Sequence, residues 1–548
     1  MTRFALDPEL AQARGDRWRL STHTASVSAE ESRRRAQDQI AWLRDYAPIR
    51  VNSQLIDERR CIPPYIAHDF GAAGLFGSLI ETRYGGTALR FSDMFRVFEQ
   101  LMAIDTTLGT WLGTSLFPGT RSLSVWASEE VKQQWLPLLA AGRTLGAYAQ
   151  TETGAGSDFT QLATTAQPVD HGWLINGDKQ FIGNGTWAGI STVIARPGGA
   201  STCGSSSLVA LAVPTANAGV LPGEEHLTFG LRGMVQSRMR FAGVRVPDSH
   251  LLANGDGRRV AMDSMSATRL GFAAFALGAL KRILQLGYSF ACRRHTGGLS
   301  LVRRAWVHEW LVETVARTDV LETLVYDLAR RLDAGEAVDI EPVITAKVLG
   351  SDWAVEAAYF LMQLMGGRGY DEANISARMY RDLRVYPIFE GPSEALRDFL
   401  GRRVLRQMPL ALAMVDRFCG TVLRERFAAA LDALPDHQPG LADAFHGPVA
   451  AALMWTLAAG AVHRAGTASP NTHAAIETNL LQVLNLPGRL RCVPTSASAD
   501  LLEDAMARYE QHIGFLAQHM PGARTSIDPL IVQGASDGYR QTPPPVIR

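Results

Sequence analysis

The feature that most constrains the fold is a block of strand-like sequence enclosed between helical regions. From Gly146 to about Leu252, short runs of β-branched and aromatic residues alternate with turn residues, as in 173–182 and 191–196. On both sides of this block, apolar residues recur at the three- and four-residue intervals of helices. Strands and helices are therefore segregated along the chain, which argues against a doubly wound α/β sheet. The pattern predicts an α+β fold that is mostly α.

Four regions follow from this pattern, and we place their boundaries at 1–145, 146–255, 256–406 and 407–548. The first, third and fourth are expected to be helical and the second to be β. Ser28 and Ser128 each precede a helical pattern with early acidic residues, which predicts that they cap helices. Asn176-Gly177 predicts a hairpin turn, because glycine accepts the positive φ that such turns need.

Composition and charge exclude several classes of protein. The chain has 548 residues, with 54 basic and 54 acidic residues, so no general attraction to nucleic acid or to an anionic membrane is expected. Its five cysteines contain no CxxC pair, so neither a disulfide framework nor a metal site is predicted. Only four of the basic residues are lysines, which we attribute to composition bias.

We expect a cytoplasmic protein without a transmembrane segment. Met1–Gly15 carries charges and lacks the apolar core of a secretory signal. The longest apolar run, 448–462, is too short at about 1.5 Å per residue to cross a hydrocarbon layer of about 30 Å. A buried helix is favoured for it over an interfacial helix.

Three segments carry candidate chemistry. Tyr148–Asp158 is a polar loop with glycines that allow close backbone approach to a ligand. In 176–185, an aromatic residue followed by small residues could pack against a flat ring. In 366–394, Glu390 lies between bulky apolar residues and Gly391-Pro392, a setting that removes solvent and makes a carboxylate a better base. Each segment alone has a simpler interpretation. The first could be a solvated turn and the second a simple hairpin, and Glu390 could be a surface residue.

Together, in this order and spacing, the segments resemble the acyl-CoA dehydrogenase family over about residues 30–406. The family's "TEP-x-AGSD" signature appears as Thr-Glu-Thr-Gly-Ala-Gly-Ser-Asp at 151–158. Its "NG-x-K-x-WITN" strand is similar to 176–184, and its "GG-x-GY…RD…EG" ending is similar to 366–370, 381–382 and 390–391. The resemblance implies an N-terminal helical domain, a small central β-barrel domain and a four-helix bundle, to which residues 407–548 add a helical extension.

The resemblance also implies FAD as cofactor, bound between the β domain and the bundle and partly covered by a second subunit. Arg293 of the neighbouring subunit would reach the pyrophosphate, and a homodimer or homotetramer is expected. The residues implied to bind FAD are Tyr148, Gln150, Thr151, Gly156, Ser157, Phe181, Ile182, Gly183, Arg293, Gln363, Gly366, Gly367 and Glu394.

By the same resemblance, Glu390 is the catalytic base that removes the α-proton of an acyl thioester while the flavin accepts the β-hydride. Some relatives carry the catalytic base at the position of Thr268. Threonine cannot act as that base, so this position provides no alternative to Glu390. The residues implied to contact the substrate are Ser157, Arg269, Gly391 and Arg402. The thioester could be carried by coenzyme A or by an acyl carrier protein, and the electron acceptor could be an electron-transfer flavoprotein or O2.

Departures from the family pattern leave alternatives open. Gly183, Pro392 and Thr296 replace residues that are usually threonine, threonine and phenylalanine. Altered surroundings of the flavin would suit an oxygen-using oxidase or monooxygenase on the same fold. The extension is similar to those of very-long-chain dehydrogenases, acyl-CoA oxidases and the alkylation-response branch, so a non-catalytic flavoprotein is a further alternative. Retention of Glu390 favours desaturation.

Overall fold

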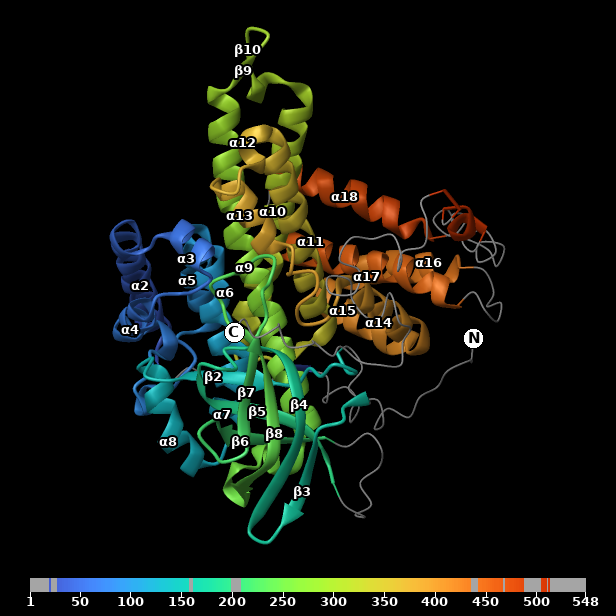
Figure 1. The fold of residues 1–548 in the computed structure, drawn as a ribbon. Helices are drawn as coiled ribbons and strands as arrows, with labels where there is room; N and C mark the ends of the chain where they lie inside the picture. Colours follow the sequence, from blue (N-terminus) through green and yellow to red (C-terminus); the bar gives the residue numbers. More distant parts are fainter. Residues whose placement is uncertain are drawn as a thin grey trace.

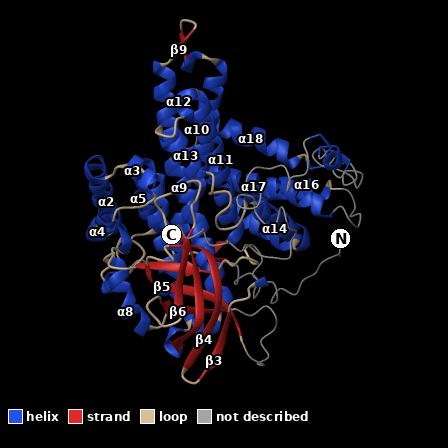
Figure 2. Ribbon diagram, viewed as in Figure 1, coloured by secondary structure: helices blue, strands red, loops and turns tan. Residues whose placement is uncertain are grey.

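The fold places one β region between helical regions (Figures 1 and 2). The computed structural model describes residues 19–20, 27–156, 161–198, 208–434, 442–466, 469–486, 504–509 and 511–512. The prediction of a mostly helical α+β fold is confirmed.

The N-terminal helices between residues 29 and 114 pack into the large apolar core of the protein, and those between 121 and 140 pack into a second cluster with residues of the sheet. The helix starts predicted at Ser28 and Ser128 are confirmed: their Oγ atoms accept hydrogen bonds from the backbone N–H of Glu31 and Val131, at 3.1 and 3.3 Å. These bonds satisfy amides that have no partner in the first helical turn. The helices are α2 (Ala29–Arg50), α3 (Ser53–Arg59), α4 (Pro64–Ala72), α5 (Phe91–Ile104), α6 (Thr106–Thr114), α7 (Arg121–Trp126) and α8 (Glu129–Ala140), with the π-helical segment η4 (Ser115–Thr120) between α6 and α7.

The β region forms one mixed, seven-stranded sheet. Its strand order is β2-β5-β3-β4-β8-β7, and β6 pairs with β5. The two longest strands, β4 and β8, run antiparallel to each other. The strands are β2 (Leu145–Ala149), β3 (Thr165–Val169), β4 (Gly172–Gly183), β5 (Ala188–Pro197), β6 (Val209–Pro214), β7 (Val220–Glu225) and β8 (Gln236–Pro247).

The hairpin turn predicted at Asn176-Gly177 is wrong. Both residues lie inside the continuous strand β4, where the register with β8 shifts between Ile175 and Asn176. The Asn176 side chain accepts a hydrogen bond from the N–H of Gly243 at 2.8 Å, and a Cβ on Gly177 would lie 2.3 Å from the Thr164 Oγ1 atom. The extra residue of this β-bulge is Gly243 on β8, and the dipeptide lies opposite it, where Asn176 binds the bulge and Gly177 allows close backbone approach.

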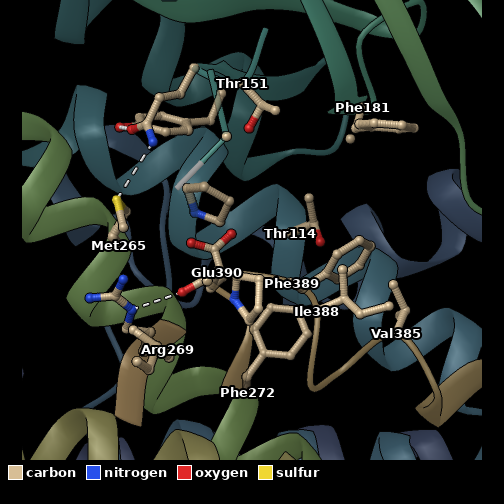
Figure 3. Close-up of a pocket in the computed structure, with 18 of the residues that line it drawn as sticks. Thr114, Thr151, Phe181, Met265, Arg269, Phe272, Val385, Ile388, Phe389 and Glu390 are labelled. Carbon is tan, nitrogen blue, oxygen red and sulfur yellow. Dashed lines mark hydrogen bonds between the residues drawn. The ribbon is translucent and has the colours of Figure 1, made fainter. Parts of the chain in front are cut away.

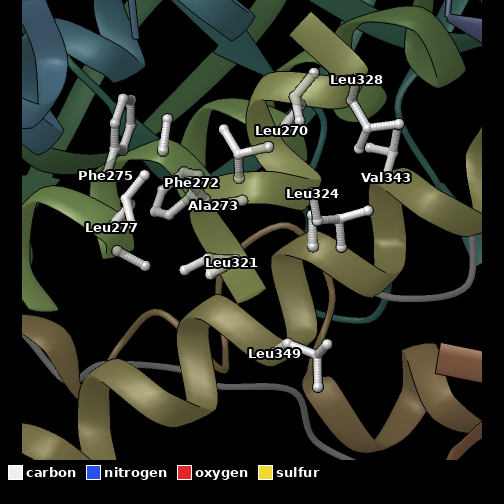
Figure 4. Packing of buried hydrophobic residues seen from close by; sticks show 14 of the residues in the cluster. Leu270, Phe272, Ala273, Phe275, Leu277, Leu321, Leu324, Leu328, Val343 and Leu349 are labelled. Atoms are coloured by element: carbon white, nitrogen blue, oxygen red, sulfur yellow. The ribbon is translucent and has the colours of Figure 1, made fainter. Parts of the chain in front are cut away.

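Three long helices follow the sheet and form the bundle, which α14 joins. Leucine, phenylalanine and alanine side chains of α9 interlock with apolar side chains of α10 and α11 (Figure 4). The elements are α9 (Gly257–Arg293), β9 (His295–Thr296), β10 (Leu299–Ser300), α10 (Ala305–Asp333), α11 (Ile340–Met365), α12 (Gly367–Tyr370), α13 (Ile375–Leu383) and α14 (Ser393–Arg406).

The C-terminal extension packs against the bundle. It contains α15 (Met408–Cys419), α16 (Thr421–Asp432), α17 (Ala442–Ala465) and α18 (Pro470–Leu484). Helix α17 lies directly on α14, since a Cβ on Gly401 would lie 2.0 Å from the carbonyl oxygen of His446. Two helices, α9 and residues 445–465 of α17, are apolar and long enough to span a membrane, but 72% and 78% of their apolar windows are buried within the protein. Such burial is typical of core helices.

Asp382 joins three parts of the fold. This fully buried carboxylate accepts hydrogen bonds from the Thr106 and Thr107 hydroxyls, at 2.5 and 3.2 Å, and from the N–H of Leu231 at 2.6 Å. It therefore ties α13 to α6 and to the segment that precedes β8. Burial raises the pKa of Asp382 to about 6, although the Thr106 and Leu231 hydrogen bonds act in the opposite direction.

A buried ion pair fixes the loop that follows β2. Lys179 Nζ on β4 lies 2.7 Å from Glu152 Oε1 and donates to the carbonyl of Gln150 at 2.9 Å. Glu152 also accepts hydrogen bonds from the N–H groups of Ala163 and Thr164. The side chains of both members of the pair are almost fully buried.

The raised pKa of Asp382 predicts pH-dependent stability. The folded protein binds the proton more tightly than the unfolded chain, whose aspartate pKa is about 3.9, so this contribution is present at low pH and is lost as pH rises. The stability advantage of the wild type over Asp382→Asn should fall by about 1.4 kcal/mol per pH unit between pH ~4 and ~6 and stay constant above. Urea unfolding at several pH values measures it, and a pH-independent difference contradicts it.

Glu152→Ala should destabilise the fold by about 3–5 kcal/mol, because it leaves the Lys179 charge buried without its partner. The double variant Glu152→Leu/Lys179→Met removes both charges and should unfold much closer to the wild type. Urea unfolding followed by tryptophan fluorescence compares the variants. An equal loss of stability in the single and double variants would show that the pairing is not what matters.

Candidate active site

A cavity of about 810 Å³ lies between the sheet and the bundle. The close-up in Figure 3 shows that one wall carries Thr114, Thr151 and Phe181, and the opposite side carries Glu390 and Phe272. Strands, the π-helical segment and bundle helices all contribute side chains, so the cavity exists only in the assembled fold.

The structure brings most of the predicted site residues to this cavity. The predicted residues that line it are Tyr148, Gln150, Thr151, Gly156, Phe181, Ile182, Gly183, Arg269, Glu390 and Gly391. Ser157, also predicted, lies outside the described residues. The predicted residues that do not line the cavity are Arg293, Gln363, Gly366, Gly367, Glu394 and Arg402. Arg402 pairs with Asp398 on its own helix α14.

Glu390 is held in an unusual backbone conformation. Its φ is 56°, in the left-handed region, where a residue other than glycine costs about 1–3 kcal/mol. Arg269 Nε donates to the Glu390 carbonyl at 2.9 Å, and Lys347 Nζ donates to the next carbonyl, that of Gly391, at 2.8 Å. These contacts fix the loop from two helices, and the Glu390 carboxylate points toward the side of Thr151 and Phe181 (Figure 3).

The surroundings of Glu390 favour its action as a base. Burial raises the pKa of the Glu390 carboxyl above its ordinary value, although Arg269 and Lys347 act in the opposite direction. A higher pKa makes the carboxylate a stronger base, and the two nearby cations favour its ionised form. The hydroxyl of Tyr148 belongs to the same environment, since burial first and Glu390 second raise its pKa.

The wall opposite Glu390 fits a flat ring system with polar edges. Tyr148 donates to Gln150 Oε1 at 2.7 Å, and Gln150 donates to the Met265 sulfur at 3.7 Å. A Cβ on Gly183 would lie 2.6 Å from the Thr114 methyl group, so the wall is tightly packed where the family usually carries threonine. Apolar faces combined with a few placed polar groups are the lining that planar cofactors occupy. The residues present therefore fit an isoalloxazine ring.

Sequence reasoning missed several residues of the site. Glu152 and Lys179 lie inside the quoted motifs, but no local sequence pattern indicates that they form an ion pair. Lys347 is fully buried. The only feature of the sequence that could have drawn attention to it is the rarity of lysine, because the chain has four lysines and otherwise uses arginine. Thr114 and Phe272 lie on helices whose facing directions only the tertiary structure provides.

Comparison with known families agrees with this site. Residues 39–143, 147–244 and 255–405 match the models of the acyl-CoA dehydrogenase N-terminal, middle and C-terminal domains. An acyl-CoA dehydrogenase of Bacillus subtilis (strain 168) is 30% identical over 370 residues, covering 66% of this chain and 96% of that protein.

Longer relatives and solved structures also match. The human mitochondrial very long-chain specific acyl-CoA dehydrogenase is 30% identical over 334 residues, which cover 60% of this chain and 51% of that protein. This chain therefore spans about half the length of that relative. The structure of butyryl-CoA dehydrogenase from Megasphaera elsdenii aligns with a TM-score of 0.63 and 25% identity, covering 68% of this chain and 98% of that one.

A glutaryl-CoA dehydrogenase from Mycobacterium smegmatis, solved in complex with FADH2, aligns with a TM-score of 0.62 and 26% identity over 67% of this chain and 94% of that chain. The three domain matches, the relatives and the cavity agree on the cofactor, FAD, and on the reaction type. The chain belongs to the acyl-CoA dehydrogenase family of FAD-dependent oxidoreductases, which act on the CH–CH bonds of acyl thioesters.

Proposed function

We propose that this protein desaturates an acyl thioester between its α and β carbons, with Glu390 as the base. The observation that carries the proposal is the position of Glu390. Its carboxylate faces the wall of Thr151 and Phe181 across one cavity, with a raised pKa and a backbone held by two cations.

The residues of this chain account for the proton transfer. Glu390 takes the α-proton, which the thioester carbonyl makes acidic when that carbonyl is polarised. Among the described residues, the backbone N–H of Glu390 has no acceptor, so it is available to donate to the carbonyl oxygen. FAD, when bound against Tyr148–Thr151 and Phe181–Gly183, supplies the acceptor for the hydride of the β-carbon.

Two carriers of the thioester and two electron acceptors are compatible with this reaction. Coenzyme A and the phosphopantetheine arm of an acyl carrier protein present the same thioester. Arg258, Arg196 and Arg269 line the cavity and give it a positive character that suits a phosphate-bearing arm. Electrons would leave to an electron-transfer flavoprotein or to O2.

We further propose that two subunits complete each site. Arg293 lies 24 residues beyond Arg269 on α9, about 36 Å along the helix at 1.5 Å per residue. It is exposed at the end of the bundle that carries β9, β10 and α12 (Figure 1), together with Gln363, Gly366 and Gly367. Large exposed aromatic residues share this end: Tyr288, Trp306, Tyr359 and Tyr370. Arg293 is too far away to reach the cavity of its own subunit, so the role in cofactor binding that the resemblance implies for it requires a second subunit.

Glu390→Gln should keep the fold and the yellow colour but lower the rate of thioester desaturation by about 10²–10⁴, the usual contribution of a general base. Glutamine preserves the shape of the side chain, so FAD content and the visible spectrum serve as controls. Stopped-flow reduction of the flavin by the substrate is the measurement. Near-normal reduction in this variant contradicts the assignment of Glu390.

The shared site predicts complementation between two inactive variants. Arg293→Glu and Glu390→Gln should each be inactive alone. In a mixed dimer, one site combines an intact Glu390 with an intact Arg293, so a randomly assembled mixture should recover about a quarter of wild-type activity. Co-expression of the two chains, followed by assay of the purified mixture, tests this prediction. Activity no greater than the sum of the separate variants contradicts it.

A further inference from the structure

Two buried cations act on consecutive peptide carbonyls beneath the site. Arg269 of α9 and Lys347 of α11 are 5% and 0% exposed. They donate to the carbonyl oxygens of Glu390 and Gly391, respectively. Among the described residues, neither cation forms a salt bridge, although buried cations in proteins are usually paired with carboxylates.

The charge of Lys347 has no explanation in the fold alone. A carbonyl can accept a hydrogen bond from any neutral donor, so holding Gly391 does not require a cation. Burial lowers the pKa of Lys347 to about 8, and Arg269 acts in the same direction, whereas Asp352, Glu390 and Glu394 oppose it. Lys347 is therefore still charged at neutral pH, where its desolvation destabilises the folded protein.

The acidic groups around Lys347 are engaged or exposed, apart from Glu390. Asp352, on α11, accepts a hydrogen bond from Ser393 and pairs with Arg397. Glu394, in the first turn of α14, is exposed to solvent. Asp352 raises the pKa of Lys347 more than Glu390 does, and the charge of Lys347 in turn lowers the pKa of the Glu390 carboxyl.

The backbone of the loop depends on the same contacts. Glu390 and Gly391 both have positive φ angles, 56° and 100°. Such conformations persist in a non-glycine residue only where the surrounding structure determines them strongly. Donors from α9 and α11 on the two carbonyls provide this constraint.

The inference that follows rests on the proposed role of Glu390. We propose that Lys347 is a positioning residue for the reaction: through the Gly391 carbonyl it fixes the direction of the Glu390 side chain, and its buried charge favours the ionised carboxylate that removes the proton. Lys347 acts through Glu390 and has no contact of its own with the reacting atoms.

The direction of the pH effect follows from the charges that face Glu390. Arg269 and Lys347 lower the pKa of Glu390, while burial raises it. Loss of the Lys347 charge should therefore raise this pKa further, and the reaction needs the ionised carboxylate. The acidic limb of the rate–pH profile should move to higher pH.

Two variants of the full-length holoenzyme separate charge from hydrogen bonding. Lys347→Met removes both charge and donor at similar volume, and Lys347→Gln keeps a donor without charge. Stopped-flow flavin reduction at saturating acyl thioester is measured from pH 5 to pH 9. Both variants should shift the acidic limb upward by about one pH unit, which makes reduction about tenfold slower below the limb. Lys132→Met, which changes a lysine of α8 that does not line the cavity, is the control and should keep the wild-type profile.

Stability distinguishes a positioning role from a structural one. Lys347→Gln removes the buried charge but keeps a donor for the Gly391 carbonyl, so its unfolding temperature should equal or exceed that of the wild type. Rate–pH profiles that superimpose on the wild type in both variants overturn the inference, as does a normal profile in Lys347→Gln alone, because the charge would then be unnecessary.

Glu390→Gln tells the two failures apart. Near-normal flavin reduction in Glu390→Gln contradicts the proposed function and therefore also the role of Lys347. If Glu390→Gln loses flavin reduction while the Lys347 variants keep the wild-type rate–pH profile, only the role of Lys347 is contradicted.

Discussion

The geometry of the site depends on how the loop of Glu390 and Gly391 is held between α9 and α11. Two charged side chains from different helices bind its two carbonyl groups, and the loop in turn connects α13 to α14. Because α9 and α11 share the apolar core shown in Figure 4, the position of the Glu390 carboxylate is set by the packing of the bundle. A carboxylate on such a support can keep one direction while substrate and cofactor bind.

Other buried polar contacts bring the remaining walls to the same place. Asp382 ties α13 to α6, which reaches the cavity at Thr114, and to the segment that precedes β8. Glu152 and Lys179 tie the loop after β2 to β4, which bears Phe181 and Gly183. Each of these contacts puts a charged or ionisable group inside the protein, and for the ion pair the replacement of both members by apolar side chains often costs little stability. Their common effect is to fix the parts of the cavity relative to one another.

Much of the fold and part of the site could be predicted from the sequence. Segregation of strands and helices indicated the order of the regions, and helix caps such as Ser28 were visible because capping is a local interaction. Asn176-Gly177 misled because the residue types of a hairpin turn here serve a position opposite a β-bulge, where Asn176 accepts a hydrogen bond from Gly243 and Gly177 lies against Thr164. The family motifs identified the residues around the cavity, including Glu390, whose chemistry no local pattern establishes.

The sequence could not provide the contacts between residues that are far apart in the chain. Lys347 and Arg269 are 78 positions apart, and only packing of α9 against α11 brings them under one loop. Composition bias accounts for the scarcity of lysine but not for the places where the lysines lie. Lys179 and Lys347 are fully buried, and Lys281 pairs with Glu99 and Glu322 between helices. Three of the four lysines therefore hold a charge inside the protein or between helices, where a compact charge on a slender side chain fits.

The most direct test of thioester desaturation is an anaerobic titration of the purified yellow protein with a panel of saturated acyl-CoAs and acylated carrier proteins, following the visible absorption of the flavin. We expect one class of thioester to bleach the flavin and to yield the α,β-unsaturated product. Retained colour with every thioester of both kinds would contradict desaturation as the function of this protein.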